Sequence, residues 1–424
     1  MTNLSSYQVL ERIYHNFQYV DIFRALQTYA IEAGGAILKI SNANSLQSIL
    51  EKDFTGDNDR SITKPTYKSF ATQFDKSEFF PDTIFIVILN ELETSVIKFE
   101  LEHYTNKGKF SLAIQKPEDG DKIFEKVEAL AQENSIYKNS IIEVEITGEI
   151  KNYFGETESK ERIELNFLEK EKIDDAKIIL DAEIQKVLQN SIFDFIENYE
   201  ILQKSNIPLK RGILFYGPPG TGKTYTSKYI ANKLQNVTSV IGKGKSLFEI
   251  KSICQIARLL QPSLVILEDV DLLFSSRDIN YQTTLLGEFL DQLDGISKND
   301  KVCFILTTNS IERIESAIKD RPGRISQCIF MGALSKDLRK KFIESYLQQY
   351  GASCENIDEI VAMTKNATQA FLKELVIRTI QIVATETRNT VSSVDEARLI
   401  EAYKIMIKDS NHHSRNILGF AIDN

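Results

Sequence analysis

Eight residues near the middle of the chain constrain its fold more than any other segment. They are Gly217, Pro218, Pro219, Gly220, Thr221, Gly222, Lys223 and Thr224. An apolar run, Gly212–Tyr216, precedes them, and a segment with helical character, Tyr225–Leu234, follows. This order is the setting of a phosphate-binding P-loop, whose glycines let backbone N–H groups converge on a phosphate at the positive end of a helix. The sequence therefore predicts a nucleoside triphosphate site. The alternative is a glycine- and proline-rich turn that binds nothing.

Two side chains of this loop have defined roles in such sites. We expect Lys223 to reach the β- and γ-phosphates of ATP, and the Thr224 hydroxyl to ligate Mg²⁺. Tyr225, which opens the helical segment, completes the predicted set of nucleotide contacts, Gly217–Tyr225.

Composition limits the class of protein. A chain of 424 residues with 42% hydrophobic and 26% charged residues is expected to form about three globular domains. The net charge of −9 argues against broad binding to nucleic acid or to an anionic membrane. Four separated cysteines without a C-x-x-C pair favour a reducing compartment. No secretory signal is visible and the longest apolar run is Ile84–Leu89, so we expect a cytoplasmic protein.

Residues 1–172 are predicted to form an α+β domain that binds a client or partner. Tyr7–Ala33 is interpreted as a helix, Ser45–Phe74 as a long loop, and Asp119–Asn134 as a second helix. Segments rich in β-branched and aromatic residues predict an antiparallel sheet with half-exposed strands. These segments are Thr83–Leu89, Val96–His103, Phe110–Ile114, Ile141–Ile146 and Arg162–Phe167.

Residues 173–332 have the pattern of a nucleotide-binding α/β domain. A helix is expected at Glu183–Tyr199, and near-continuous apolar strands alternate with helical stretches, which indicates a parallel sheet with helices on both faces. Those strands are Val237–Ile241, Leu264–Leu267, Val302–Thr307 and Gln327–Met331. Residues 333–409 are predicted to form a helical lid, and residues 410–424 a tail. The expected lid helices are Lys336–Tyr350, Ile357–Lys365, Gln369–Thr387 and Val394–Lys408, the last with a capping box of Ser393 and Glu396.

A second chemical element follows the strand Leu264–Leu267. Glu268 and Asp269 emerge at its carboxyl end, which is the edge where open α/β sheets bind ligands. One acid is expected to hold the Mg²⁺ shell while the next polarises an attacking water. A solvated strand end is the alternative, and the complete P-loop upstream favours the catalytic interpretation.

From Asp174 to Lys408 the chain resembles the AAA family of ATPases, within the wider AAA+ class. The resemblance rests on the P-loop, on Glu268-Asp269, on Leu306–Asn309, on Arg321–Arg324 and on the helical lid. Within the family, the chain resembles in sequence pattern the branch of the mitochondrial chaperone that translocates the folded Rieske iron–sulfur protein. That branch shares the Glu-Asp order and a segment like Ile207–Gly212.

The resemblance implies roles for individual positions. Glu268 would take the metal-side place through water, Asp269 the water-activating place, and Asn309 the place of a polar residue that orients the water. Arg321 and Arg324 match arginine fingers that reach the γ-phosphate of a neighbouring subunit, which implies a ring of six or seven copies. The alternatives are a turn at Pro322-Gly323 flanked by solvated arginines and, for Asn309, a turn-forming asparagine. The segment before Arg321 carries one residue more than the family pattern.

Two further segments depart from the family. Gly242–Phe248 lacks the usual aromatic pore series; Phe248 is expected to pack in the core, with a pore aromatic as the alternative, and movement of a folded client is favoured over threading of an unfolded chain. Gln369 stands where the lid usually has glycine in the turn that touches adenine and ribose.

The leading hypothesis is an ATP-driven machine that remodels a protein client, with the N-terminal domain binding the client or a separate partner enzyme. The alternative is a slowly hydrolysing assembly switch or scaffold. A nucleic-acid motor finds little support in the acidic charge balance.

Overall fold

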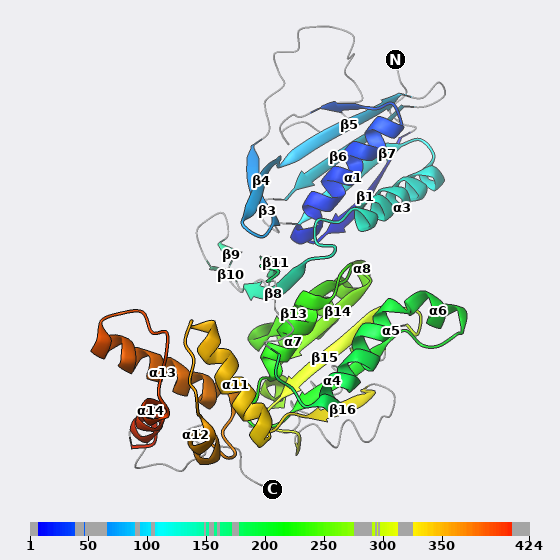
Figure 1. Ribbon diagram of the computed structural model, residues 1–424. Coiled ribbons are helices and arrows are strands. Elements are labelled where there is room, and N and C mark those ends of the chain that lie inside the picture. Colours follow the sequence, from blue (N-terminus) through cyan, green and yellow to red (C-terminus); the bar gives the residue numbers. More distant parts are fainter. Residues whose placement is uncertain are drawn as a thin grey trace. The chain divides into compact units, whose positions relative to one another are not determined.

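The structure is a computed structural model of the 424-residue chain (Figure 1). It describes residues 7–38, 46, 66–89, 94–102, 107–147, 150–151, 157–158, 162–171, 178–274, 291–292, 295, 297–312 and 325–408. The chain separates into two compact units, Met1–Glu169 and Lys170–Asn424. The sequence places the corresponding boundary at residue 172.

The first unit is built on an antiparallel sheet with two helices over one face (Figure 1). Its strands, in spatial order, are β1 (Gln8–Tyr14), β7 (Gly108–Ile114), β6 (Thr94–Leu101), β5 (Thr83–Leu89) and β2 (Ala36–Leu38). The helices are α1 (Tyr19–Glu32) and α3 (Pro117–Glu133). Alternate residues such as Ile97 and Phe99 face these helices and form the core. The predicted α+β class and three of its central strands are confirmed.

The predicted helix Tyr7–Ala33 is wrong in its first half. β1 occupies Gln8–Tyr14 and pairs with β7, and α1 begins only at Tyr19. The apolar spacing that suggested a helix does not mark a buried face, because Val9 is 54% exposed and Ile13 is 61% exposed. Pairing with β7, a partner about a hundred residues away, decides this segment, and local spacing cannot reveal it.

A hairpin also replaces the end of the predicted loop Ser45–Phe74. β3 (Tyr67–Gln73) pairs with β4 (Lys76–Pro81) in antiparallel fashion. Farther along the chain, β8 (Ile141–Thr147) and β11 (Arg162–Leu168) form the expected antiparallel pair. Two short strands, β9 (Ile150–Lys151) and β10 (Thr157–Glu158), pair with each other between them.

The second unit contains a parallel sheet in the order β13-β14-β15-β12-β16. Its strands are β12 (Arg211–Tyr216), β13 (Thr238–Lys243), β14 (Ser263–Glu268), β15 (Val302–Thr308) and β16 (Gln327–Phe330). All of β15, and all of β14 except Glu268, is buried. Burial on both faces is the property of parallel strands covered by helices, so the predicted nucleotide-binding architecture is confirmed.

Helices of the second unit accompany these strands. α7 (Lys223–Lys233) follows β12, and α8 (Ile250–Leu259) packs on β13 and β14. The predicted continuous helix Glu183–Tyr199 is interrupted: α4 (Ala182–Leu188) runs into a π-helical turn, Gln189–Phe193. α5 (Asp194–Glu197) and α6 (Tyr199–Lys204) then follow.

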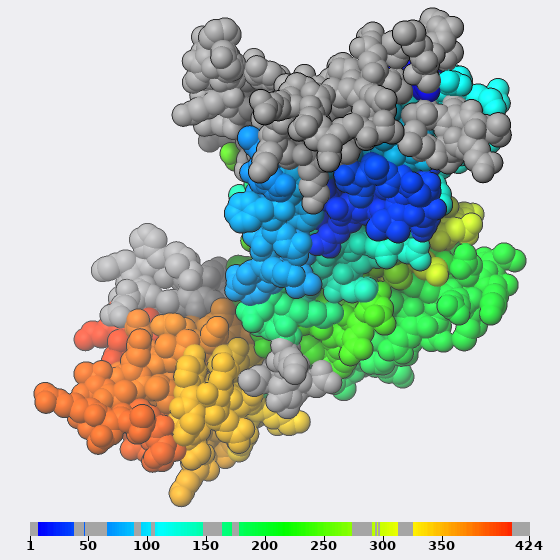
Figure 2. Space-filling view, turned by 90° about the horizontal axis from the view of Figure 1, so that it is seen from above, coloured from blue at the N-terminus to red at the C-terminus, as the bar shows by residue number. Residues whose placement is uncertain are grey.

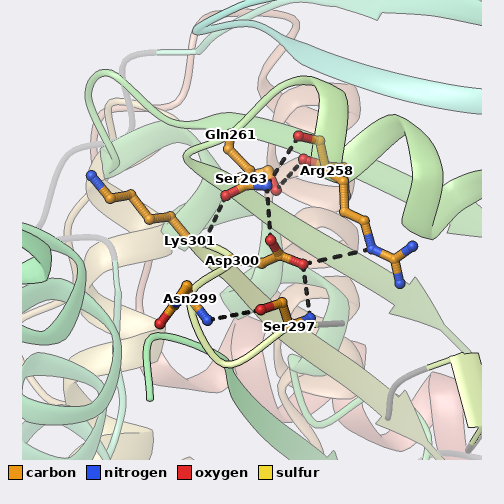
Figure 3. Close-up of polar contacts among 8 residues, drawn as sticks. Arg258, Gln261, Ser263, Ser297, Asn299, Asp300 and Lys301 are labelled. Atoms are coloured by element: carbon orange, nitrogen blue, oxygen red, sulfur yellow. Dashed lines mark hydrogen bonds and ion pairs between the residues drawn. The ribbon is translucent and has the colours of Figure 1, made fainter. Parts of the chain in front are cut away.

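A polar cluster joins the segments that lead into β14 and β15 (Figure 3). The Gln261 Nε2 donates to Asp300 Oδ1 at 3.5 Å, and its Oε1 accepts from the Lys301 N–H at 2.7 Å. Asp300 Oδ2 accepts from the Ser297 N–H at 2.9 Å and lies 3.7 Å from Arg258 Nε. The cluster fixes the amino ends of the two strands whose carboxyl ends carry Glu268 and Asn309.

The lid consists of α11 (Lys336–Gln349), α12 (Asp358–Met363), α13 (Gln369–Thr387) and α14 (Glu396–Lys408). These helices share a core of their own and gather in one lobe, coloured orange to red in Figure 2. The predicted capping box is wrong. Asp395 Oδ1 accepts from the Arg398 N–H at 3.0 Å, while Glu396 Oε1 accepts from the Glu359 N–H of α12 at 2.7 Å.

Among the described residues no helix has the length and hydropathy needed to cross a bilayer.

Candidate nucleotide-binding site

The loop between β12 and α7 has a backbone that only glycine adopts readily. Gly217, Gly220 and Gly222 have φ values of +145°, +79° and +89°. A Cβ at Gly217 would lie 2.2 Å from the carbonyl oxygen of Met331, so the residue that follows β16 closes one side of the loop. The Thr221 hydroxyl donates to Pro218 O at 2.9 Å and fixes the turn. The sequence-predicted strand–loop–helix is present, with Lys223 as the first residue of the helix.

Lys223 is an ammonium held inside the loop. Its side chain is buried, and Nζ donates to Gly217 O and to Pro218 O, both at 2.8 Å. Burial lowers the pKa of Lys223 to about 8, and the carboxylates of Asp269 and Asp271 oppose that shift. A cation that is poorly solvated and donates its hydrogen bonds to neutral carbonyl oxygens favours an anionic ligand. Phosphate groups supply such a ligand.

Asp269 and Asn309 meet at the carboxyl edge of the sheet. The Asn309 Nδ2 donates to Asp269 Oδ1 at 3.1 Å, and the Asp269 N–H donates to Thr307 Oγ1 at 3.0 Å. Asp269 has a φ of +52°, a left-handed conformation that is uncommon for residues other than glycine, although aspartate adopts it more readily than most. Backbone conformations of this kind concentrate at functional sites. The structure therefore brings two of the sequence-predicted residues into contact.

One cavity of about 460 Å³ lies beside the loop, which is a usual size for a small-molecule site. The part of the second unit that contains the parallel sheet lines it with Pro219, Gly220, Gly222, Lys223, Thr224, Tyr225, Asp269 and Asn309. Glu268, at the end of β14, is half-buried and is not in this lining. Six of the nine sequence-predicted loop residues thus face one space with the Asp269–Asn309 pair, whereas Gly217, Pro218 and Thr221 are absent from its lining.

The lid supplies the opposite wall. Phe342 and Tyr346 of α11 stack with ring centroids 4.6 Å apart, and both line the cavity with Gln369 and Lys373 of α13. The sequence-based prediction missed the aromatic pair, although its spacing of four residues places both rings on one helix face. It also missed Ile178 and Leu180, which line the cavity from the segment before α4.

The lid also touches the phosphate loop directly. The Ala370 N–H donates to Gly220 O at 3.0 Å. A Cβ at Gly222 would lie 2.3 Å from Gln369 Oε1, so the Gln369 carboxamide covers this glycine. Gln369, noted in the sequence as a departure, therefore lies against the loop rather than in solvent.

The expectation for Phe248 is wrong. The segment after β13 forms a 3₁₀ helix, η5 (Gly244–Glu249), in which Leu247 is buried and Phe248 is 46% exposed. Leu247 takes the core position that the sequence assigned to Phe248. Arg321 and Arg324 lie outside the described residues.

The site combines a buried lysine in a glycine-rich loop with an acid and an amide at the ends of neighbouring strands, and a helical lid lines the same cavity. Together these features define a P-loop nucleotide-binding protein. Residues 213–333 match the family described as "ATPase family associated with various cellular activities (AAA)". This chain therefore contains an AAA-family ATPase domain, and the predicted resemblance is confirmed.

Several curated proteins are similar to the chain. The probable mitochondrial chaperone bcs1 of Schizosaccharomyces pombe is 27% identical over 210 residues, 48% of this chain and 46% of that protein. The mitochondrial chaperone BCS1 of Bos taurus is 30% identical over 207 residues, 46% of this chain and 49% of that protein. The proteasome-activating nucleotidase of Methanocaldococcus jannaschii is 28% identical over 239 residues, 51% of this chain and 55% of that protein. The chain thus matches about half the length of each.

Proposed function

We propose that the protein is a Mg²⁺-dependent ATPase that couples ATP turnover in a ring of identical subunits to remodelling, translocation or disassembly of a protein client. The observation that carries the proposal is the cavity shared by the phosphate loop and the lid, which are joined by the Ala370–Gly220 hydrogen bond. Because both parts line one space, a ligand that enters or leaves it is expected to move the lid against the core.

The roles of the site residues follow from their chemistry. Lys223 binds the β- and γ-phosphates, and Thr224 with Glu268, the latter through water, would hold Mg²⁺. When bound, Mg²⁺ neutralises developing phosphate charge. Asp269 accepts a proton from the attacking water, and Asn309 orients that water. The loop fits a phosphate because Gly220 and Gly222 hold its backbone at positive φ, and a Cβ at either position would press on the lid, 3.0 Å from Ala370 Cβ and 2.3 Å from Gln369 Oε1.

We assign Arg321 and Arg324 to the site of a neighbouring subunit, which makes a hexamer or heptamer part of the enzyme. A mixing experiment tests this. Lys223→Ala and Arg321→Ala are each expected to abolish turnover, whereas mixed rings regain activity where an intact loop meets an intact arginine. Specific activity of the wild type should also rise with protein concentration. Mixtures that stay inactive, with a wild type whose specific activity is independent of concentration, would contradict the ring.

Exposed apolar side chains offer a contact for the client. Phe248 is 46% exposed on η5, and Leu272 is 45% exposed on the neighbouring 3₁₀ helix, η6 (Val270–Phe274). Lys245 adds an exposed positive charge beside Phe248. We expect Phe248→Ala to keep basal ATPase activity and to lose stimulation by an unfolded probe, reduced and carboxymethylated lactalbumin. Equal stimulation of both proteins would remove Phe248 from the client contact.

The N-terminal unit is proposed to bind the client or a separate partner enzyme, because the family match, residues 213–333, lies entirely in the second unit. Relatives named as a chaperone and as a proteasome-activating nucleotidase support work on proteins. The proposal involves neither nucleic acid nor a membrane, in keeping with the net charge of −9.

One observation favours the alternative of an assembly switch. Asp269 is one methylene shorter than glutamate, and its carboxylate already accepts a hydrogen bond from Asn309. An enzyme with such a base is expected to hydrolyse ATP slowly. A switch would bind its partner in the ATP state without client-stimulated turnover, so stimulation of ATPase activity by a polypeptide decides between the two functions.

A further inference from the structure

Asp271 is the second acid after β14, and it contacts the end of the neighbouring strand. Its Oδ1 accepts from the Thr308 hydroxyl at 2.9 Å and from the Asn309 N–H at 3.1 Å. A single carboxylate oxygen therefore holds two successive residues at the point where β15 ends. Hydrogen bonds to an ionised acceptor are stronger than those between neutral groups.

The same bonds determine where Asn309 can lie. Asn309 is exposed, and its side chain donates to Asp269 Oδ1 while its backbone N–H donates to Asp271. Asp269 and Asn309 line the cavity, whereas Asp271 is absent from the lining that the described residues form. Apart from the field of its charge, any effect of Asp271 on the reaction therefore passes through the residues that it holds.

We propose that Asp271 is a positioning residue that fixes the backbone of Asn309, so that the Asn309 carboxamide stays aimed at Asp269 and the cavity. This inference rests on the proposed role of Asn309 in orienting the attacking water. Without the two hydrogen bonds the strand end is free to shift. A displacement of about 1 Å in a reacting group lowers turnover by up to about 100-fold.

A second explanation for Asp271 predicts a different result. The negative charge of Asp271 also acts on Lys223 and opposes the lowering of the Lys223 pKa. Asp271→Asn removes the charge but retains an oxygen that can accept both hydrogen bonds, whereas Asp271→Ala removes charge and acceptor together. The pair of variants therefore separates positioning from electrostatics.

The test compares Asp271→Asn, Asp271→Ala, Asn309→Ala and the double alanine variant in the full-length protein. We expect Asp271→Ala to lower kcat by about tenfold, with the affinity for a fluorescent ATP analogue within twofold of wild type. Asp271→Asn should lower kcat by at most about threefold. Since both residues act at one point, the double variant should be no slower than Asn309→Ala.

Three results would overturn the proposal. In the first, Asp271→Asn is as slow as Asp271→Ala, which assigns the effect to charge. In the second, the losses of the two alanine variants multiply in the double variant, which makes the residues independent. In the third, Asn309→Ala turns over like wild type, which refutes the proposed role of Asn309 itself. If Asp271→Ala does not fold, Thr308→Val serves in its place: it removes one of the two bonds to Asp271, together with the bond that Thr308 Oγ1 accepts from the Ser310 N–H, and kcat should fall while analogue binding is retained.

Discussion

Substitution of Gly217 by alanine tests how tightly the phosphate loop is fitted to the sheet. Gly217 has a φ of +145°, and an added Cβ would lie 2.2 Å from Met331 O. The neighbouring Met331 N–H donates to Tyr216 O at 2.8 Å, so the clash is with a strand-end backbone that is itself hydrogen-bonded. Neither partner can move aside by a change of rotamer.

The loss of unfolding free energy in Gly217→Ala has two contributions. Forcing alanine into this backbone region costs about 1–3 kcal/mol. The contact is also more than about 1 Å shorter than non-bonded atoms prefer, so the strand ends must separate and weaken a hydrogen bond worth about 1 kcal/mol. The total is about 2–4 kcal/mol. For a unit of this size, each kcal/mol lowers Tm by about 2–4 °C, which gives a fall of about 5–15 °C.

Gly244→Ala is the matched control. Gly244 also has a positive φ, +56°, but a Cβ there would meet no atom within 4 Å. It therefore carries the backbone cost alone, about 1 kcal/mol and about 2–4 °C. Scanning calorimetry of both variants, with and without ATP, provides the comparison. Equal Tm shifts for the two variants would refute the steric reasoning, and ATP should stabilise Gly244→Ala but not Gly217→Ala.

Three other predictions concern titration and packing. Burial raises the pKa of Asp21 to about 6, so the contribution of Asp21 to the unfolding free energy falls as pH rises from about 4 to 6. Urea titrations should show the wild type losing roughly 2 kcal/mol of unfolding free energy relative to Asp21→Asn over that range. The same pH dependence in both proteins would contradict this prediction. Because the pKa of Lys223 is about 8, ATP binding should take up protons near pH 8.5 and weaken at higher pH. Calorimetry in buffers of different ionisation enthalpy measures this uptake. Proton uptake that persists in Lys223→Met would exclude Lys223 as the group that takes up the proton. Asp300→Ala should lower the unfolding free energy by about 1 kcal/mol, because the Ser297 N–H loses its acceptor while the Gln261 amide keeps its bond to Arg258 O; Asn299→Ala, which keeps its backbone bond, should change it little.

The sequence alone predicts much of the second unit because its strands are buried on both faces. Apolar runs such as Leu264–Leu267 are stable only in strands that are covered on both faces. The predicted boundaries of α13, Gln369–Thr387, agree with the structure at both ends. The P-loop is predictable for a related reason: Gly217 and Gly222 need backbone conformations that other residues resist.

What the sequence does not reveal depends on distant partners. β1 becomes a strand because β7 pairs with it, and Phe248 is exposed because Leu247 fills the adjoining core position. The lid wall is the largest omission at the site. Phe342 and Tyr346 have ordinary core spacing, and only the approach of α11 to the phosphate loop gives them a place in the cavity. The roles of Arg321 and Arg324, and the cytoplasmic location, stay predictions.

The most direct test of the account compares ATP binding and Mg²⁺-dependent hydrolysis in wild type and in Asp269→Asn. The amide keeps the shape of the carboxylate but cannot accept the proton of an attacking water. The account predicts that both proteins bind ATP, that wild type hydrolyses it, and that Asp269→Asn is at least about 100-fold slower. Hydrolysis by Asp269→Asn at the wild-type rate would contradict the central claim that ATP is hydrolysed in this cavity with Asp269 as the base.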